Sequence, residues 1–172
     1  MEIIDKQNGL PERKDYSEED RMFMQMAIEL SVENIDSGGG PFGAVIVKEG
    51  KIVAIGTNRV TCNNDPTAHA EVLAIRKAGK KLKTFDLSGC EIYTSCEPCP
   101  MCLGAIYWAH IDRIYYGNTK EDAANIGFDD SFIYQELDLE KEDRKIKMFQ
   151  LLPEEALKTF VQWSEKEDKV KY

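Results

Sequence analysis

The sequence predicts a single α/β domain, arranged as a three-layer α/β/α sandwich around a mixed, mainly parallel sheet of five strands. Three observations lead to this prediction. A chain of 172 residues fits one domain. Short apolar runs of strand length alternate with stretches whose apolar residues recur at helical spacing. Glycine and proline separate these segments, and strands that alternate with helices usually form a parallel sheet covered on both faces.

The first predicted element is a helix that starts at Ser17, after a loose polar arm over residues 1–16. Ser17 is a favourable N-cap, and the three acidic residues after it suit the positive end of a helix dipole. Four apolar residues share one face at helical spacing, namely Phe23, Met26, Ala27 and Leu30. Three glycines followed by Pro41 end this helix.

Two strands, over residues 42–48 and 51–58, follow around a Glu-Gly turn and predict a hairpin. The other strands are expected over residues 90–94, 113–117 and 145–152. The other helices are expected from about His69 to Gly79, from Pro98 to about Ala109, near residues 121–125, and from Pro153 to Lys169. The charged stretch 134–147 is expected to be an exposed loop.

The composition indicates which cellular compartment and which binding partners to expect. No apolar run approaches the roughly 18–20 residues that span a bilayer, so no membrane partner is expected. The N-terminus lacks the apolar core of a signal peptide, so a cytoplasmic protein is expected. The net charge of −9 argues against nucleic acid as substrate, because a phosphate backbone is bound by a basic surface.

Two short segments carry the chemistry: His69-Ala70-Glu71, and Pro98-Cys99-Pro100-Met101-Cys102. Their spacing resembles H-x-E … P-C-x-x-C, the pattern of zinc-dependent nucleobase deaminases. A catalytic zinc takes three protein ligands and keeps a position open, and His69, Cys99 and Cys102 supply one nitrogen and two thiolates. Glu71 is not needed as a ligand, so its carboxylate is free to move protons. The sequence therefore predicts one catalytic Zn²⁺ in each chain.

Two other interpretations of the cysteines remain open. A structural zinc site would need a fourth ligand, for which Cys96 and His110 are the candidates. The C-x-x-C pair could also be a redox pair. The coincidence of a histidine, a glutamate, a proline and two cysteines favours the catalytic site over both.

Beyond this pattern, the chain resembles the cytidine deaminase-like superfamily, and within it the bacterial guanine deaminases. The resemblance covers nearly the whole chain after about residue 20 and rests on residues 39–47, 63–71, 93–109 and 127–134. The Gly-Phe-Asp-Asp segment that ends at Asp130, and the terminal Tyr172, point to the guanine branch. The resemblance implies a zinc-dependent deaminase domain over residues 17–172.

The resemblance also implies roles for further residues. Asn58 would hydrogen-bond the purine, and Asp130 would recognise the guanine edge and help protonate the leaving amine. Phe42 and Trp108 would pack around the ring, and Tyr172 would help close the pocket. Each residue has a structural alternative as well: a turn for Asn58, core packing for the two aromatic residues, a loop cap for Asp130 and a frayed end for Tyr172.

The activity implied by the resemblance is hydrolysis of guanine to xanthine and ammonia, with Glu71 as the proton shuttle. The partners implied are a small purine base and a second copy of the chain, in a homodimer with exchanged C-terminal segments. Three alternatives are kept: a tRNA adenosine deaminase, a cytosine-type base deaminase, and a catalytically silent zinc-binding partner subunit. The acidic composition and the Gly-Phe-Asp-Asp segment argue against the tRNA enzyme.

Overall fold

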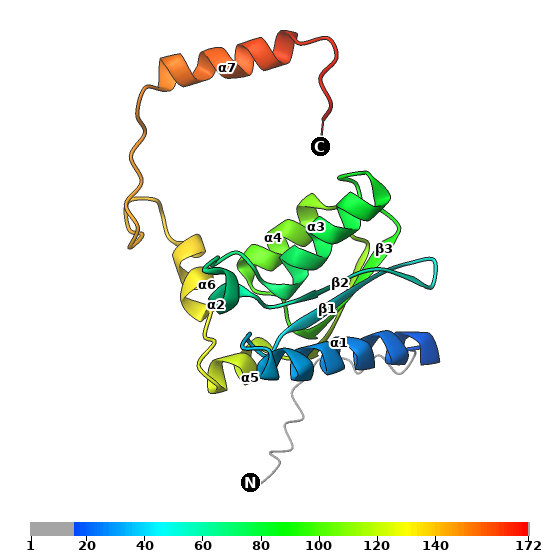
Figure 1. Ribbon diagram of the computed structural model, residues 1–172. Helices are drawn as coiled ribbons and strands as arrows, with labels where there is room; N and C mark the ends of the chain where they lie inside the picture. Colours follow the sequence, from blue (N-terminus) through cyan, green and yellow to red (C-terminus); the bar gives the residue numbers. More distant parts are fainter. Residues whose placement is uncertain (1–15, 172) are drawn as a thin grey trace.

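The structure is a computed structural model that describes residues 16–171, so nearly all of the predicted N-terminal arm lies outside the described residues. Its centre is a four-stranded sheet with the strand order β2-β1-β3-β4 (Figure 1). The strands are β1 (Gly43–Lys48), β2 (Lys51–Thr57), β3 (Cys90–Cys96) and β4 (Arg113–Asn118).

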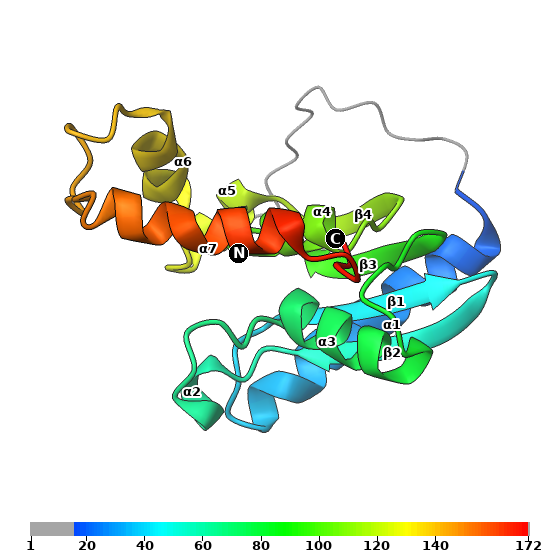
Figure 2. The same cartoon turned by 90° about the horizontal axis from the view of Figure 1, so that it is seen from above.

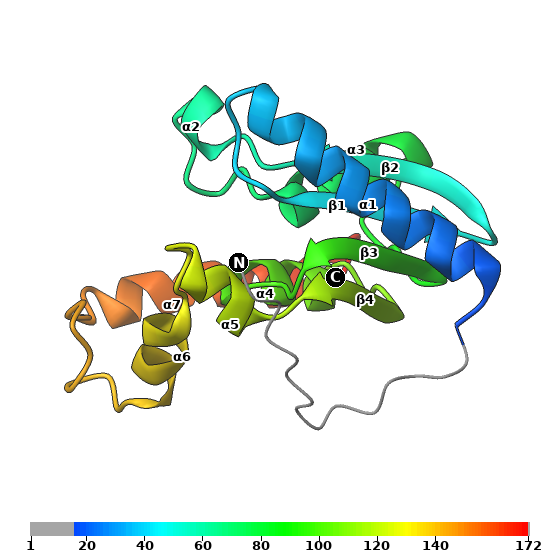
Figure 3. The ribbon, with the colours of Figure 1, turned by 90° about the horizontal axis from the view of Figure 1, so that it is seen from below.

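Seven helices lie within residues 16–171: α1 (Glu18–Asp36), α2 (Val60–Asn63), α3 (Ala70–Leu82), α4 (Pro100–Trp108), α5 (Lys120–Asn125), α6 (Ser131–Asp138) and α7 (Pro153–Glu165). Helix α1 covers one face of the sheet, and α3 and α4 cover the other (Figures 1 and 3). This arrangement confirms the three-layer α/β/α prediction. Over the same residues, no helix combines the length and the apolar character that a membrane crossing requires.

The hydrophobic core has two halves, one on each face of β1. Ala44 and Ile46 pack with apolar residues of α3 and α4, whereas Val45 and Val47 pack with Phe23 and Ala27 of α1. Side chains of successive strand residues point to opposite faces, so an uninterrupted apolar run fits a strand that is covered on both sides. The apolar run in the sequence therefore becomes the central strand of the domain.

Helix α1 begins as its sequence predicts. The Ser17 hydroxyl accepts a hydrogen bond from the backbone N–H of Asp20 at 3.0 Å, and the Asp20 carboxylate accepts one from the backbone N–H of Ser17 at 2.8 Å. This reciprocal capping box satisfies two donors that the first helical turn would leave without a partner.

The prediction of a mainly parallel sheet was wrong. Strand β1 is antiparallel to both of its neighbours, β2 and β3, and only β3 and β4 form a parallel pair. The crossover through α3 does make β2 and β3 run in the same direction, as a strand-helix-strand unit should. Strand β1 of the hairpin lies between them, however, so the two parallel strands are not neighbours.

The predicted fifth strand over residues 145–152 was also wrong, since no strand is formed there within residues 16–171. All five of its apolar side chains are exposed: Ile146, Met148, Phe149, Leu151 and Leu152. Part of the expected loop 134–147 is helical instead, because α6 extends to Asp138. Figure 1 shows α7 clear of the sheet, and Figure 2 shows the long connection from α6 that leads to it.

Gly56 determines how closely α3 approaches the sheet. A Cβ atom at Gly56 would lie 2.1 Å from the carbonyl oxygen of Ala70, the first residue of α3. Only glycine permits this contact between backbone atoms. The start of α3, where His69 and Glu71 lie, is therefore held tightly against β2.

Candidate metal centre and active-site pocket

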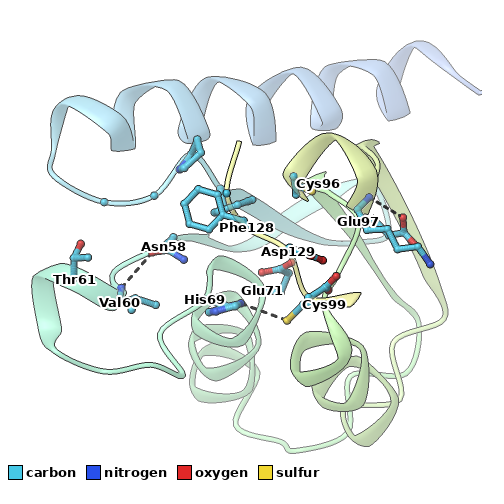
Figure 4. A pocket seen from close by; sticks show the side chains of 18 of the residues that line it. Asn58, Val60, Thr61, His69, Glu71, Cys96, Glu97, Cys99, Phe128 and Asp129 are labelled. Atoms are coloured by element: carbon cyan, nitrogen blue, oxygen red, sulfur yellow. Dashed lines mark hydrogen bonds between the residues drawn. The ribbon is translucent and has the colours of Figure 1, made fainter. Parts of the chain in front are cut away.

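His69 is distant in the sequence from Cys99 and Cys102, yet the three side chains meet at the starts of two helices (Figure 4 shows His69 and Cys99). The Nδ1 atom of His69 lies 3.5 Å from the Sγ atom of Cys99 and 3.4 Å from that of Cys102. The three potential ligand atoms all lie within 4.8 Å of one another. The structure therefore brings together the three ligands that the sequence predicts.

Backbone geometry at the two helix starts presents these side chains. His69 is the N-cap of α3 and Cys99 the N-cap of α4, and neither side chain makes a capping hydrogen bond. Helix α4 begins at Pro100, not at Pro98 as predicted. A residue that precedes proline is pushed out of the helical region, which keeps Cys99 extended, with φ −64° and ψ 168°. Cys99 and Cys102 thus face each other as N-cap and first-turn residues.

The three side chains fit a zinc ion. Zn–N and Zn–S bonds of roughly 2.0 and 2.3 Å at a tetrahedral angle place nitrogen and sulfur about 3.6 Å apart. The two distances from His69 to the sulfur atoms, 3.5 and 3.4 Å, agree with this geometry.

The pKa values of the two thiol groups also favour a metal site. Hydrogen bonds from Cys102 and His69 lower the pKa of Cys99 to about 4, whereas the Cys99 thiolate and burial raise the pKa of Cys102. The two thiolates would repel each other and the nearby carboxylate of Glu71. Both cysteines therefore ionise together only when they bind a cation. The group is therefore a site for one Zn²⁺.

Glu71 lies beside this centre, in the first turn of α3, and only 6% of its surface is exposed. Burial raises the pKa of its carboxyl group. The hydroxyl of Thr94 on β3 donates to its Oε1 atom at 3.4 Å. A buried carboxyl group with a raised pKa at a metal centre is suited to accept a proton and then give it up.

The metal centre opens into a cavity of about 610 Å³ (Figure 4). Its walls come from the glycine loop before β1, the end of β2, the starts of α3 and α4, and the segment from α5 to α6. The volume lies within the range of small-molecule sites, roughly 300–1,000 Å³.

Three of the predicted substrate residues line the cavity: Asn58, Phe42 and Asp130. Asn58 follows β2 and is 7% exposed. Burial and the nearby Cys99 thiolate raise the pKa of Asp130. Trp108 lies at the end of α4, is 67% exposed and does not line the cavity, and Tyr172 lies outside the described residues.

Sequence reasoning assigned no role to Phe128, although it lines the same cavity. Its ring meets that of Phe42 edge to face, with the ring centres 5.0 Å apart. Edge-to-face pairs are a preferred arrangement of aromatic rings, so the two residues form one apolar wall. Its position two residues before Asp130 in the Gly-Phe-Asp-Asp segment was the available signal.

The two candidates for a fourth ligand are not part of this group, although Cys96 lines the same cavity. The Sγ atom of Cys96 faces the backbone carbonyl of Thr119 at 3.6 Å, and the Nδ1 atom of His110 lies 3.5 Å from the carboxylate of Asp86. Within residues 16–171, the ligand group comprises His69, Cys99 and Cys102 alone. Three protein ligands beside a cavity are the arrangement of a catalytic zinc, whereas a structural zinc has four.

Comparison with known proteins agrees with this assignment. Residues 17–118 match the family described as the cytidine and deoxycytidylate deaminase zinc-binding region. A guanine deaminase from Bacillus subtilis is 54% identical over 151 residues, which cover 87% of this chain and 97% of that protein. The X-ray structure of guanine deaminase from B. subtilis covers 88% of this chain and 98% of its own, with 53% identity and a TM-score of 0.86.

Two further relatives act on or bind other bases. A tRNA-specific adenosine deaminase from Buchnera aphidicola is 35% identical over 131 residues, or 76% of this chain and 85% of that protein. The structure of NE0047 in complex with 2,6-diaminopurine is 40% identical, covers 64% of this chain and 62% of its own, and gives a TM-score of 0.63. With its His-Cys-Cys centre and buried glutamate, the chain belongs to the cytidine and deoxycytidylate deaminase family of zinc-dependent hydrolytic deaminases.

Proposed function

We propose that the protein hydrolyses guanine to xanthine and ammonia. The observation that carries the proposal is the shared cavity, where the zinc ligands and Glu71 face Asn58, Asp130 and an aromatic wall. A planar base fits between such walls, with a few polar groups to fix its orientation. The 54% identity to a guanine deaminase, and the purine held in the NE0047 structure, support guanine as the substrate.

Bound zinc and the cavity residues each have a separate role in the proposed reaction. Bound zinc would supply the charge that lowers the pKa of a water molecule to roughly 7. Glu71 accepts a proton from the water that attacks C2 of guanine and delivers it to a ring nitrogen. Asp130 helps to pass the proton of the new C2 hydroxyl group to the amine, so that the C2–N bond breaks, ammonia leaves and C2 keeps a carbonyl oxygen. Asn58 hydrogen-bonds the ring, and Phe42 with Phe128 packs against it.

An ammonia-release screen tests this function. We expect turnover with guanine, and a kcat/KM at least about 10²-fold lower with adenine, cytosine, guanosine and an anticodon stem-loop. Buried polar groups that match one base are left unpaired by another, which is the physical source of such discrimination. Ammonia from guanosine or the stem-loop but not from guanine would overturn the substrate assignment.

The alternatives have less support. Phenylalanine and acidic side chains, rather than a basic surface, surround the cavity, although Lys120 also lines it. A tRNA enzyme would need positive charge to bind the phosphate backbone. A silent zinc-binding subunit would have no use for the buried proton carrier Glu71.

We also propose that the active form is a homodimer in which the C-terminal segments are exchanged. Helix α7 has no buried residue, yet one side of it carries Leu157, Phe160 and Val161, all exposed. The predicted strand 145–152 is likewise apolar and exposed, and β4 pairs only with β3 within residues 16–171. A second copy of the chain would cover both surfaces if the two chains exchanged their C-terminal segments. Such an exchange between identical chains is a low-cost way to form a dimer. Trp108 and Tyr172 would then complete the pocket across the dimer.

Light scattering after gel filtration tests the dimer. We expect twice the chain mass of 19.6 kDa for the wild type. Phe160→Glu should raise the dimer dissociation constant at least about 10-fold, because it would bury an unpaired charge in an apolar interface. The matched control is Lys158→Glu on the same helix, which should remain dimeric. A monomeric wild type that is fully active would contradict the proposal.

A further inference from the structure

Asn34, near the end of α1, has an unusual environment for a helical residue. Only 3% of its surface is exposed, although it carries a polar amide. Asparagine is a poor helix former, and a buried amide is costly unless its hydrogen bonds are satisfied. The hydrogen bonds that offset this cost must therefore come from residues outside the helix.

The amide nitrogen of Asn34 joins two segments of the cavity wall. It donates to the carbonyl oxygen of Gly40 at 2.7 Å and to that of Asn58 at 2.8 Å. Its Oδ1 atom accepts from the guanidinium of Arg59 at 3.4 Å. An NH₂ group supplies two protons for two carbonyl groups, which neither a carboxylate nor an apolar side chain can do.

Packing around this junction leaves no free space. A Cβ atom at Gly39 would lie 2.3 Å from the Asn34 amide nitrogen and 2.3 Å from the carbonyl oxygen of Asn58. The helix end, the glycine loop and the end of β2 are therefore in direct contact at one point.

The junction also fixes Asn58. Its backbone N–H donates to the carbonyl of Phe42 at 3.1 Å, and its backbone carbonyl accepts from Asn34. Its side-chain Oδ1 atom accepts from the backbone N–H of Val60 at 3.2 Å. With the backbone held on both sides, the direction in which the Asn58 side chain enters the cavity depends on Asn34.

We propose that Asn34 is a positioning residue, which ties α1 to the backbone of Gly40 and Asn58 and so holds Asn58 in place for substrate. The inference rests on the proposed function in one respect, the contact between Asn58 and the purine. Asn34 itself does not line the cavity, so it acts through Asn58 and not on the base.

Hydrogen exchange of the wild type and Asn34→Ala tests the positioning without any substrate. We expect exchange to be about 5- to 10-fold faster in peptides that contain residues 38–42 and 58–60, the ratio that corresponds to one or two lost hydrogen bonds. Peptides around Cys99 and Cys102 should be unchanged. The matched control is Ser31→Ala on the same helix, since the Ser31 hydroxyl donates only to Ile28 of α1 at 2.7 Å. Asn34→Ser, which keeps one donor, serves as the test if the alanine variant does not fold.

Steady-state kinetics tests whether Asn34 affects substrate binding by positioning Asn58. Asn34→Ala should raise KM for guanine about 10-fold with kcat changed less than about 3-fold, which is the pattern of lost substrate binding. In an Asn58→Ala background, the same substitution should change KM less than about 2-fold, because two residues in one chain of contacts are not additive.

The outcomes separate the two proposals. Unchanged exchange and KM in Asn34→Ala overturn the positioning role, and so do fold-changes that multiply in the double variant. A lower kcat with lost zinc at constant KM overturns it as well, since it marks a general structural role. A wild type that releases no ammonia from guanine refutes the proposed function, while the exchange experiment still decides the role of Asn34.

Discussion

Glu71→Gln should lower kcat for guanine by at least about 10²-fold, and up to about 10⁴-fold, the range for loss of a general acid–base group. Glutamine has nearly the same shape and can keep the contact with the Thr94 hydroxyl, at 3.4 Å in the wild type. It cannot accept the proton of the attacking water or deliver it to the ring. KM and zinc content should therefore stay near the wild-type values while turnover falls.

The measurement is steady-state ammonia release, with zinc determined by elemental analysis on the same samples. Glu121→Gln, on the exposed first turn of α5, removes the same charge from a residue that does not line the cavity, and it should keep full activity. If Glu71→Gln turns over at the wild-type rate with full zinc, Glu71 has no part in proton transfer.

Cys102→Ala should remove zinc and activity together. The remaining ligands, His69 and Cys99, leave the ion with two protein contacts, which is fewer than a catalytic site uses. Mutation of groups behind the ligands already costs roughly 10- to 100-fold in metal affinity, so loss of a ligand should exceed that. The ligands come from the starts of α3 and α4, so zinc also links two helices, and the melting temperature should fall.

Zinc titration with a competing chelator and a thermal melt provide the two readouts. Cys62→Ser is the matched control, because Cys62 is exposed and its Sγ atom only approaches the backbone carbonyls of Ser37 and Gly38. It should bind one zinc per chain and melt like the wild type. Stoichiometric zinc in Cys102→Ala at wild-type affinity would exclude Cys102 as a ligand.

Local sequence patterns predicted most elements and the ligand group. The positions of the ligands follow from helix starts: His69 precedes α3, and Cys99 precedes a proline that begins α4. Such geometry depends on neighbours within a few residues, which the sequence displays directly. The boundaries still moved, since α4 starts two residues later than predicted.

Long-range pairing explains the errors in the sheet. A strand-helix-strand unit fixes the direction of its strands but not whether they are neighbours, and β1 lies between β2 and β3. Residues 145–152 have the apolar character of a strand but pair with no strand inside residues 16–171. A strand forms only where a partner offers hydrogen bonds, and no local pattern reports the partner.

By itself, the sequence determined the three-layer class and the grouping of His69, Cys99 and Cys102, and it predicts Glu71 as the proton carrier, because coordination chemistry and helix starts are encoded in short spacings. Only the tertiary structure decided the strand order, the wall made by Phe42 and Phe128, and the link from Asn34 to Asn58 across 24 positions. These features depend on contacts between residues distant in the chain, and such contacts exist only after the layers have packed.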